Sequence, residues 1–237
     1  MKRERFQLRE TIVTIIAEED VHIEAAKKEI QECRMEIERF IRRDDFFRVT
    51  LEPFKCSRDD PEIIKKMCKS SEKFNIGPMS TVAGIIAEYA IKAMVSNGAK
   101  YAVVDNGGDI ALFSDRKITV GIYTGKQSTD NFAFQVLPKN EIVGICTSSG
   151  NIGHSLSFGN ADAVTVISHD ISLADATATA LSNLVNTKND IKDAFKILEN
   201  VDEIIGAMIV IGNKVGLWGE VPRIIHAKVP VELVTRG

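Results

Sequence analysis

The chain has 237 residues, of which 44% are hydrophobic and 27% are charged. This composition is far from that of a disordered protein, and the length is sufficient for a substantial core. The net charge of -3 gives no electrostatic reason to expect a nucleic acid or an anionic membrane surface as a partner.

Neither a membrane segment nor a metal-type cysteine motif stands out. The amino end, MKRERFQLRE, has no apolar signal-peptide core, and the longest strongly apolar run, at 204–212, is too short to cross a bilayer. The cysteines Cys33, Cys56, Cys68 and Cys146 include no CxxC pair, so we expect free or buried thiols rather than disulfides or a zinc site. A cytoplasmic protein is predicted.

The predicted elements begin with a strand at 11–19 and an amphipathic helix that ends near Arg43. An extended segment at 46–54 follows, then a helix at 59–74 that starts with acid and proline, and a small-residue helix at 79–98. Further strands are expected at 101–105, 110–113, 118–125, 132–137, 141–148, 161–168, 206–212 and 215–221, with helices near 173–186 and 190–200. The pattern predicts an α+β fold, a single domain over 1–237 with largely antiparallel sheets and packed helices.

The stretch DNGGDI has two interpretations. Asn106–Gly107 favours a tight hairpin, because Asn-Gly supplies the positive φ angles of a primed turn. That turn does not account for a second glycine, Gly108, followed by Asp109. Two glycines without side-chain bulk would also let a ligand approach the backbone closely.

The loop 147–164 is rich in glycine, hydroxyl and amide groups, which suits phosphate binding. It matches neither a Walker A loop nor GxGxxG. It also misses the nucleophile elbow, because Ser157 stands where the second glycine should be. His154 is a candidate general base or ligand contact, although a lone loop histidine is more often solvated.

The stretch LADATATA also leaves two interpretations open. Ser172-x-x-Asp175 has the form of a helix capping box, which would make Asp175 architectural. Asp175 and Thr179 are also four residues apart, so their oxygens would project from one helix face and could share Mg²⁺. The small-residue helix start at 77–88 likewise suits either an anion or close helix packing.

Taken in order, the segments 77–88, VVDNGGDI, TSSGN and ADATATA resemble the ApbE-like superfamily, whose founding members are FAD:protein FMN transferases. Each motif is weak alone, but four in the same order and spacing are specific. The fuller combination, GPMSTVAG, NGGDI, GHSLSFGNADAVTV and LADATATA, is more similar to a short branch of that superfamily found in archaea and bacteria.

The resemblance implies a bound flavin nucleotide, FAD, and Mg²⁺. It assigns the metal to Asp175 and Thr179, with Ser80 from the helix-start loop, or Thr81 after a one-residue shift of alignment. The residues it implies for the flavin nucleotide are Asn106, Gly107, Gly108, Ser149, Gly150 and Asn151. Asp109 and His154 are the candidates for polar contacts or proton transfer.

In the transferases a threonine hydroxyl of an acceptor protein attacks the FMN phosphorus and AMP leaves, whereas some relatives use water instead. This chain departs from them by having Ala83 where they place Lys or Glu, Glu88 where they place aspartate, and no HHIIDPRTG stretch. Three hypotheses therefore remain: a Mg²⁺-dependent enzyme acting on FAD or a related nucleotide, a non-catalytic flavin or nucleotide binder, and an oligomer-forming structural protein. The expected partners are a flavin or nucleotide and an acceptor protein, with a homo-oligomer as a further candidate.

Overall fold

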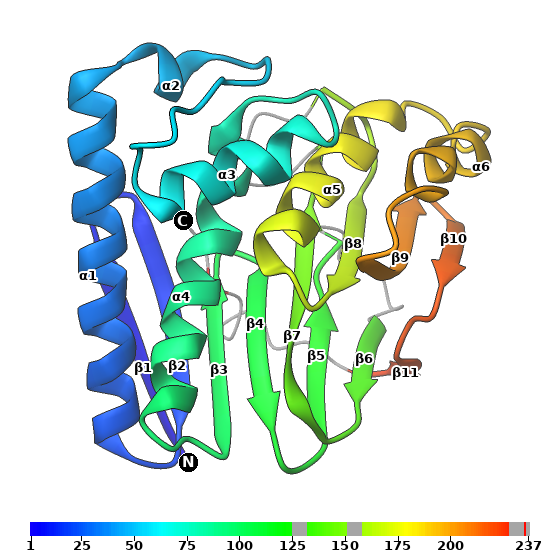
Figure 1. The fold of residues 1–237 in the computed structure, drawn as a ribbon. Helices are drawn as coiled ribbons and strands as arrows, with labels where there is room; N and C mark the ends of the chain where they lie inside the picture. Colours follow the sequence, from blue (N-terminus) through cyan, green and yellow to red (C-terminus); the bar gives the residue numbers. More distant parts are fainter. Residues whose placement is uncertain (125–131, 151–157, 228–234, 236–237) are drawn as a thin grey trace.

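The computed structural model describes residues 1–124, 132–150, 158–227 and 235, which form three layers (Figure 1). Helices cover one face of an eight-stranded sheet, and a three-stranded sheet packs on the other face. In spatial order the large sheet contains β1 (Lys2–Leu8), β2 (Thr11–Ala17), β3 (Tyr101–Asn106), β4 (Asp109–Ser114), β7 (Lys139–Ser148), β8 (Ala163–Ser168), β9 (Ile204–Ile211) and β10 (Lys214–Gly219). The small sheet contains β11 (Arg223–His226), β6 (Phe132–Val136) and β5 (Ile118–Ile122).

Every pair of neighbouring strands in the two sheets is antiparallel. Side chains of alternate residues point to opposite faces of the large sheet, which therefore contributes to two cores. Val104 of β3 is buried under the helices, whereas Val103 faces the small sheet. The predicted α+β fold with largely antiparallel sheets and packed helices is confirmed.

The helical layer is built mainly from segments inserted between β2 and β3 and between β8 and β9. Its members are α1 (Asp20–Arg43), α2 (Phe46–Val49), α3 (Glu62–Glu72), the 3₁₀ helix η1 (Pro78–Thr81), α4 (Val82–Ser96), α5 (Ile171–Leu184), α6 (Ile191–Ala194) and the 3₁₀ helix η2 (Phe195–Leu198). Apolar residues at helical spacing bury one face of α1, as predicted. Helix α4 packs against α1, β3, β4 and α5, and α5 lies over β7 and β8 (Figure 1).

Three elements differ from the predictions. The charged amino end forms β1, an edge strand, where charged side chains are common because they discourage pairing with other chains. Strand β11 was likewise not expected. The segment predicted to be extended begins with α2, because the Asp44 carboxylate accepts the Phe46 N–H at 3.1 Å and Phe47 is buried against the ring of Phe40.

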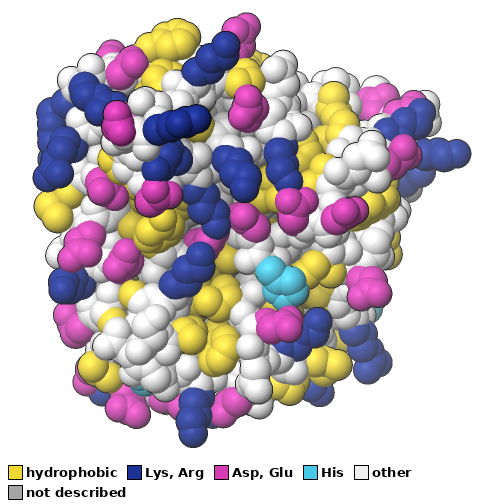
Figure 2. Space-filling model, viewed as in Figure 1, with side chains coloured by type: hydrophobic (Ala, Val, Ile, Leu, Met, Phe, Trp, Pro, Cys, Tyr) yellow, Lys and Arg dark blue, Asp and Glu magenta, His cyan; other side chains and the backbone are white. Residues whose placement is uncertain are grey.

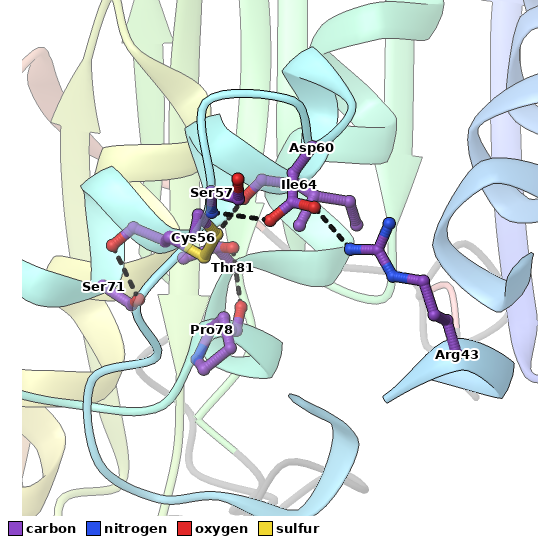
Figure 3. Close-up of a disulfide and its surroundings, with 9 residues drawn as sticks. Arg43, Cys56, Ser57, Asp60, Ile64, Ser71, Pro78 and Thr81 are labelled. Carbon is purple, nitrogen blue, oxygen red and sulfur yellow. Dashed lines mark hydrogen bonds and ion pairs between the residues drawn. A yellow bond between two sulfur atoms is a disulfide. The ribbon is translucent and has the colours of Figure 1, made fainter. Parts of the chain in front are cut away.

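The prediction of free thiols is wrong for Cys56 and Cys68, which form a disulfide (Figure 3). The Asp60 carboxylate accepts the Ser57 N–H at 2.7 Å and pairs with Arg43 of α1. These contacts fold the connection back onto α3, so that the Cα atoms of the two cysteines are 6.5 Å apart, within the range that a disulfide bridges. The other two cysteines are free and buried, as expected.

The surface carries both signs of charge. On the face shown in Figure 2, basic and acidic side chains are interspersed over the helical layer. Exposed ion pairs such as Lys73–Glu203 join elements that are distant in sequence. In the part of the chain that the structure describes, no helix combines the length and the apolar character that a bilayer span requires.

The disulfide yields a prediction about stability. Replacing Cys56 and Cys68 together by serine is expected to lower the free energy of unfolding by about 2–3 kcal/mol, because an open loop of this length has more entropy in the unfolded chain. Urea unfolding followed by circular dichroism measures the difference. Added reductant should destabilise the wild type and leave the double variant unchanged; equal stability of both proteins without reductant would contradict the prediction.

Candidate functional site

The site begins where α4 and α5 approach each other. The backbone N–H of Gly84, in the first turn of α4, donates a hydrogen bond to Asp175 Oδ2 at 2.8 Å. A Cβ atom on Gly84 would lie 2.7 Å from Asp175 Cβ and 2.8 Å from the carbonyl oxygen of Ile171. Glycine is therefore required at this position, and the close packing explains part of the small-residue composition that the sequence shows.

The stretch DNGGDI forms the predicted hairpin between β3 and β4, but the turn is centred on Gly107 and Gly108 rather than on Asn106 and Gly107. Gly107 and Gly108 have φ angles of +68° and +104°, and Asn106 and Asp109 pair across the turn. The Asn106 side chain donates to the carbonyl oxygen of Ala83 at 3.1 Å. This bond ties the turn to the first residues of α4 and places Asp109 next to the junction of α4 and α5.

Asp109, Cys146 and Asp175 approach one another here from three parts of the fold, and Thr179 follows one turn after Asp175 on α5. We call these four residues the acidic corner. Asp109 of β4 lies directly opposite Cys146 of β7, whose thiol lies 3.5 Å from the carbonyl oxygen of Ile171. Asp109, Asp175 and Thr179 are 9%, 7% and 8% exposed, so all three are largely buried. Sequence reasoning missed Cys146, because nothing local marks a cysteine that meets its neighbours only through sheet pairing.

The two carboxyl groups of the acidic corner are buried close to each other, which disfavours a negative charge on both. Burial raises the pKa of Asp109 well above its usual value and the nearby Asp175 carboxylate raises it further, while the Cys146 thiol acts in the opposite direction. Burial also raises the pKa of Asp175, against the effect of the Gly84 N–H. Within the described residues no lysine or arginine forms an ion pair with either group.

The donor set of the acidic corner fits a hard cation. Carboxylate and hydroxyl oxygens are ligands that Mg²⁺ takes, and a cation would relieve the repulsion between Asp109 and Asp175. In the described ranges no group of three or more His, Cys, Asp or Glu side chains is arranged to hold a metal. The remaining ligands of such an ion would therefore be hydroxyl, water or phosphate oxygens, which is common for Mg²⁺.

The capping box predicted from Ser172 and Asp175 does not form. Helix α5 starts earlier than expected, and Asp170 is its N-cap, accepting the Leu173 N–H at 3.0 Å. Asp175 therefore lies beyond the first turn and makes its bond across to α4. The Thr177 hydroxyl bonds back to the carbonyl oxygen of Leu173 at 2.6 Å and is fully buried, so it has a packing role.

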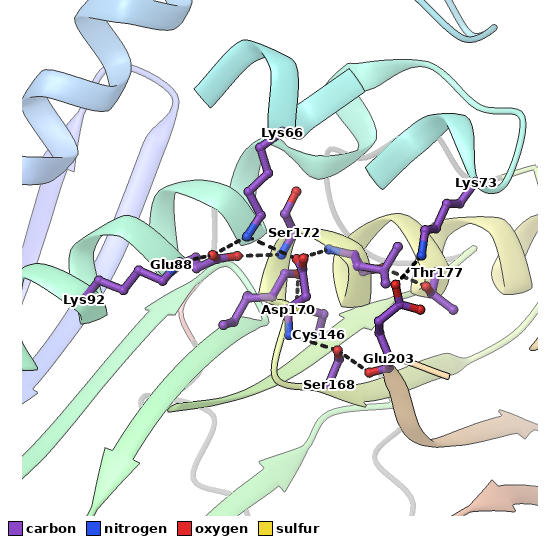
Figure 4. A network of polar contacts seen from close by, with 12 residues as sticks. Lys66, Lys73, Glu88, Lys92, Cys146, Ser168, Asp170, Ser172, Thr177 and Glu203 are labelled. Carbon is purple, nitrogen blue, oxygen red and sulfur yellow. Dashed lines mark hydrogen bonds and ion pairs between the residues drawn. The ribbon is translucent and has the colours of Figure 1, made fainter. Parts of the chain in front are cut away.

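Glu88 is the centre of a network of ion pairs and hydrogen bonds that joins α3, α4 and α5 (Figure 4). Its carboxylate pairs with Lys66 of α3 and Lys92 of α4, and it accepts the Ser172 N–H of α5 at 3.2 Å. Although burial alone would raise the pKa of Glu88, the two lysines hold it below its usual value. Glu88 thus joins three helices, and of these contacts only the Lys92 pair, four residues along the helix, could be found from sequence.

The other predicted residues belong to η1 or follow β7 in the chain. The Ser80 hydroxyl donates to the carbonyl oxygen of Gly77 at 2.7 Å, and Thr81 bonds similarly to Pro78 at 2.8 Å. Ser149 and Gly150 follow β7, whose Thr147 N–H bonds to the hairpin at Gly108. The predicted residues Asn151 and His154 lie outside the described residues.

Comparison with known proteins places these features in a family. A family model described as AbpE bacteria matches residues 1–213. The chain belongs to this ApbE-like family. It is 48% identical to a UPF0280 protein of Methanosarcina barkeri over 99% of this chain and 93% of that protein. It is 49% identical to a UPF0280 protein of Methanothrix thermoacetophila over the full length of both.

Solved structures extend the family relationship to the fold. The flavinyl transferase ApbE of Pseudomonas stutzeri superposes with a TM-score of 0.56 at 13% identity, covering 92% of this chain and 94% of that one. For the flavin transferase ApbE of Vibrio cholerae the TM-score is 0.57 at 13% identity, with 93% and 96% covered. At this identity the likeness concerns the fold alone. The ApbE-like resemblance predicted from the motifs is thereby confirmed.

The helix contact at Gly84 predicts that an alanine at this position destabilises the protein, the opposite of its usual effect in a helix. Glycine to alanine in a helix normally stabilises by up to about 1 kcal/mol. Gly84→Ala is instead expected to destabilise by about 1–3 kcal/mol, because the new methyl group would overlap Asp175 and Ile171. Urea unfolding measures the change, with Ala83→Gly as the matched control, for which a loss of only about 0.5–1 kcal/mol is expected. A stabilised Gly84→Ala protein would contradict the close contact.

Glu88 gives a prediction about pH. Glu88→Gln is expected to lower the free energy of unfolding by about 2 kcal/mol at pH 7, because a buried carboxylate bonded to two lysines and a backbone N–H is lost. Since the pKa of Glu88 is lowered on folding, its contribution is present above its unfolded pKa and is lost as pH falls through the folded value.

The difference between wild type and Glu88→Gln should therefore be largest near pH 7 and shrink below about pH 4. Urea unfolding at both pH values measures it. Lys92→Gln, which removes one half-exposed partner, is the control and should cost less than about 1 kcal/mol. A difference that grows towards acid pH would show that the carboxylate is not stabilised as described.

Proposed function

We propose that the acidic corner binds Mg²⁺ and a flavin nucleotide, and that the protein cleaves the pyrophosphate of FAD or transfers its FMN part to an acceptor. The observation that carries this proposal is the buried pair Asp109 and Asp175, which has no basic partner among the described residues. The family relationship and the fold shared with flavin transferases point to the same ligands.

Each group of the corner has a proposed role. Asp175, held by the Gly84 N–H, and Thr179 on the same face of α5 would hold the metal, with Ser80 supplying a hydroxyl from η1. Bound Mg²⁺ supplies neutralisation of phosphate charge and polarisation of the phosphorus. Asp109 would contact the nucleotide or accept a proton, a role shared with His154.

The remaining elements position the ligand. Among the described residues, no atom lies within 4 Å of the position that a Cβ on Gly107 would take, which supports an approach of the ligand to the hairpin backbone at this point. The hairpin residues Asn106 to Gly108, together with Ser149, Gly150 and Asn151 after β7, are the proposed nucleotide contacts. In the reaction, a hydroxyl oxygen of a protein threonine or of water bonds to the FMN phosphorus, its proton is lost, and the bond to AMP breaks.

A second function is a flavin or nucleotide binder without catalysis. The methyl group of Ala83, at the start of α4 beside the acidic corner, offers neither the charge nor the hydrogen bonds of the Lys or Glu that transferases place there. The carboxylate of Glu88, where the transferases have aspartate, is already paired with two lysines and hydrogen-bonded to a backbone N–H of α5. In this case FAD binds in the presence of Mg²⁺ but no AMP is released.

The two functions separate in one experiment. The purified protein is mixed with FAD, with and without Mg²⁺, while flavin fluorescence reports binding and chromatography reports AMP. Asp175→Asn is expected to weaken Mg²⁺-dependent FAD binding at least tenfold and to abolish any AMP release, because a metal ligand becomes neutral. Asp170→Asn makes the same chemical change at the N-cap of the same helix and should bind like the wild type.

The outcomes have distinct meanings. AMP release by the wild type supports the enzyme, and binding without AMP supports the non-catalytic binder. Wild-type protein that neither binds nor cleaves FAD in the presence of Mg²⁺ would refute both. Equal loss of binding in Asp170→Asn and Asp175→Asn would show that the effect comes from damage to α5 rather than from the acidic corner.

A further inference from the structure

Ser148, the last residue of β7, has a hydroxyl group that the described part of the chain leaves without a hydrogen bond. The residue is 8% exposed, and its Oγ atom is buried without a hydrogen-bond partner in the described part of the chain. The neighbouring Thr147 differs, because its hydroxyl bonds to that of Thr165 at 3.0 Å on the opposite face of the sheet. Buried hydroxyl groups are nearly always paired in native proteins, so an unpaired one requires an explanation.

The packing of β7 under α5 fixes the direction in which Ser148 points. Residues two apart in a strand face the same side, so Ser148 lies on the helix side together with Gly144 and Cys146. Gly144 lies against Ile171, since a Cβ on the glycine would be 2.7 Å from Ile171 Cγ1. Cys146 comes next along β7, and its thiol lies 3.5 Å from the carbonyl oxygen of Ile171, which points towards the following turn of α5.

Beyond Ser148, the chain also packs closely against the end of α5. A Cβ on Gly150 would be 1.9 Å from the carbonyl oxygen of Gly159, and a Cβ on Gly159 would be 1.7 Å from that of Ser182 near the end of α5. Two residues of a strand rise about 6.6 Å and four residues of a helix rise about 6 Å. Each pair of residues along β7 therefore corresponds to about one turn of α5 between the contact at Ile171 and the contact at Ser182. Ser148 is therefore level with the turn that carries Asp175 and Thr179.

The chemistry of a hydroxyl group at this place suits a phosphate. The acidic corner already supplies two carboxylates, and the Ser148 hydroxyl bonds to neither of them. We propose that Ser148 is a binding residue of the acidic corner, whose hydroxyl donates a hydrogen bond to a phosphate oxygen of the bound flavin dinucleotide. This inference rests on the proposed function and adds a phosphate contact that the sequence motifs did not assign.

Ser148→Ala tests the inference through binding and stability together. In the presence of Mg²⁺ the variant should bind FAD about tenfold more weakly or worse, because a hydrogen bond to a charged oxygen is lost. Its binding of riboflavin, which has no phosphate, and of Mg²⁺ alone should match the wild type. Its melting temperature without ligand should be unchanged or higher, since a buried unpaired hydroxyl group is removed.

Thr147→Val is the matched control, because it removes a paired hydroxyl group from the adjacent residue. It should lower the melting temperature and leave FAD affinity unchanged. Ser148→Ala protein with wild-type FAD affinity, with equally weakened riboflavin binding, with weakened Mg²⁺ binding or with a lowered melting temperature would each overturn the phosphate role. Absence of FAD binding by the wild type would instead refute the proposed function, and the inference with it.

Discussion

The two central helices cap each other, and the rest of the site depends on this exchange. The Asp175 carboxylate of α5 accepts a hydrogen bond from the Gly84 N–H at the start of α4. In return, the Glu88 carboxylate of α4 accepts one from the Ser172 N–H at the start of α5. The first N–H groups of a helix have no acceptor within it, and they favour negative charge. Each helix therefore satisfies a terminus of the other and fixes how closely the two can pack.

These two carboxylates are nevertheless in opposite electrostatic situations. Glu88 is neutralised by Lys66 and Lys92, so its burial is compensated within the protein. Asp175 has a second carboxylate, Asp109, as its neighbour and a single backbone N–H as its described hydrogen-bond donor. Because an uncompensated buried charge is costly, the contrast distinguishes a structural capping residue from a candidate ligand-binding residue on the same pair of helices.

Local patterns in the sequence predicted local structure well. The hairpin at 105–110 was predicted because a short polar, glycine-containing stretch between two apolar runs favours a tight turn, although the residues with positive φ are Gly107 and Gly108 rather than Asn106 and Gly107. The strand at 2–8 was missed because edge strands need no apolar alternation, and the Cys56–Cys68 disulfide because chain reversal at Asp60 depends on Arg43 of another helix. In the candidate site only Asp175 and Thr179 are connected by a local pattern, their helical spacing, whereas Asp109 and Cys146 come from other parts of the chain. The ordered set of family motifs was therefore needed to favour a site over a helix cap.

The bond between Gly84 and Asp175 also makes one amide proton a reporter of the assembled site. N–H groups in the first turn of a helix normally exchange with deuterated solvent quickly, because they have no acceptor within the helix. The Gly84 N–H occupies such a position, yet its acceptor is 91 residues away in sequence. Its exchange requires the hydrogen bond to Asp175 to open. The exchange rate of this amide therefore measures how often the contact between α4 and α5 opens at the acidic corner.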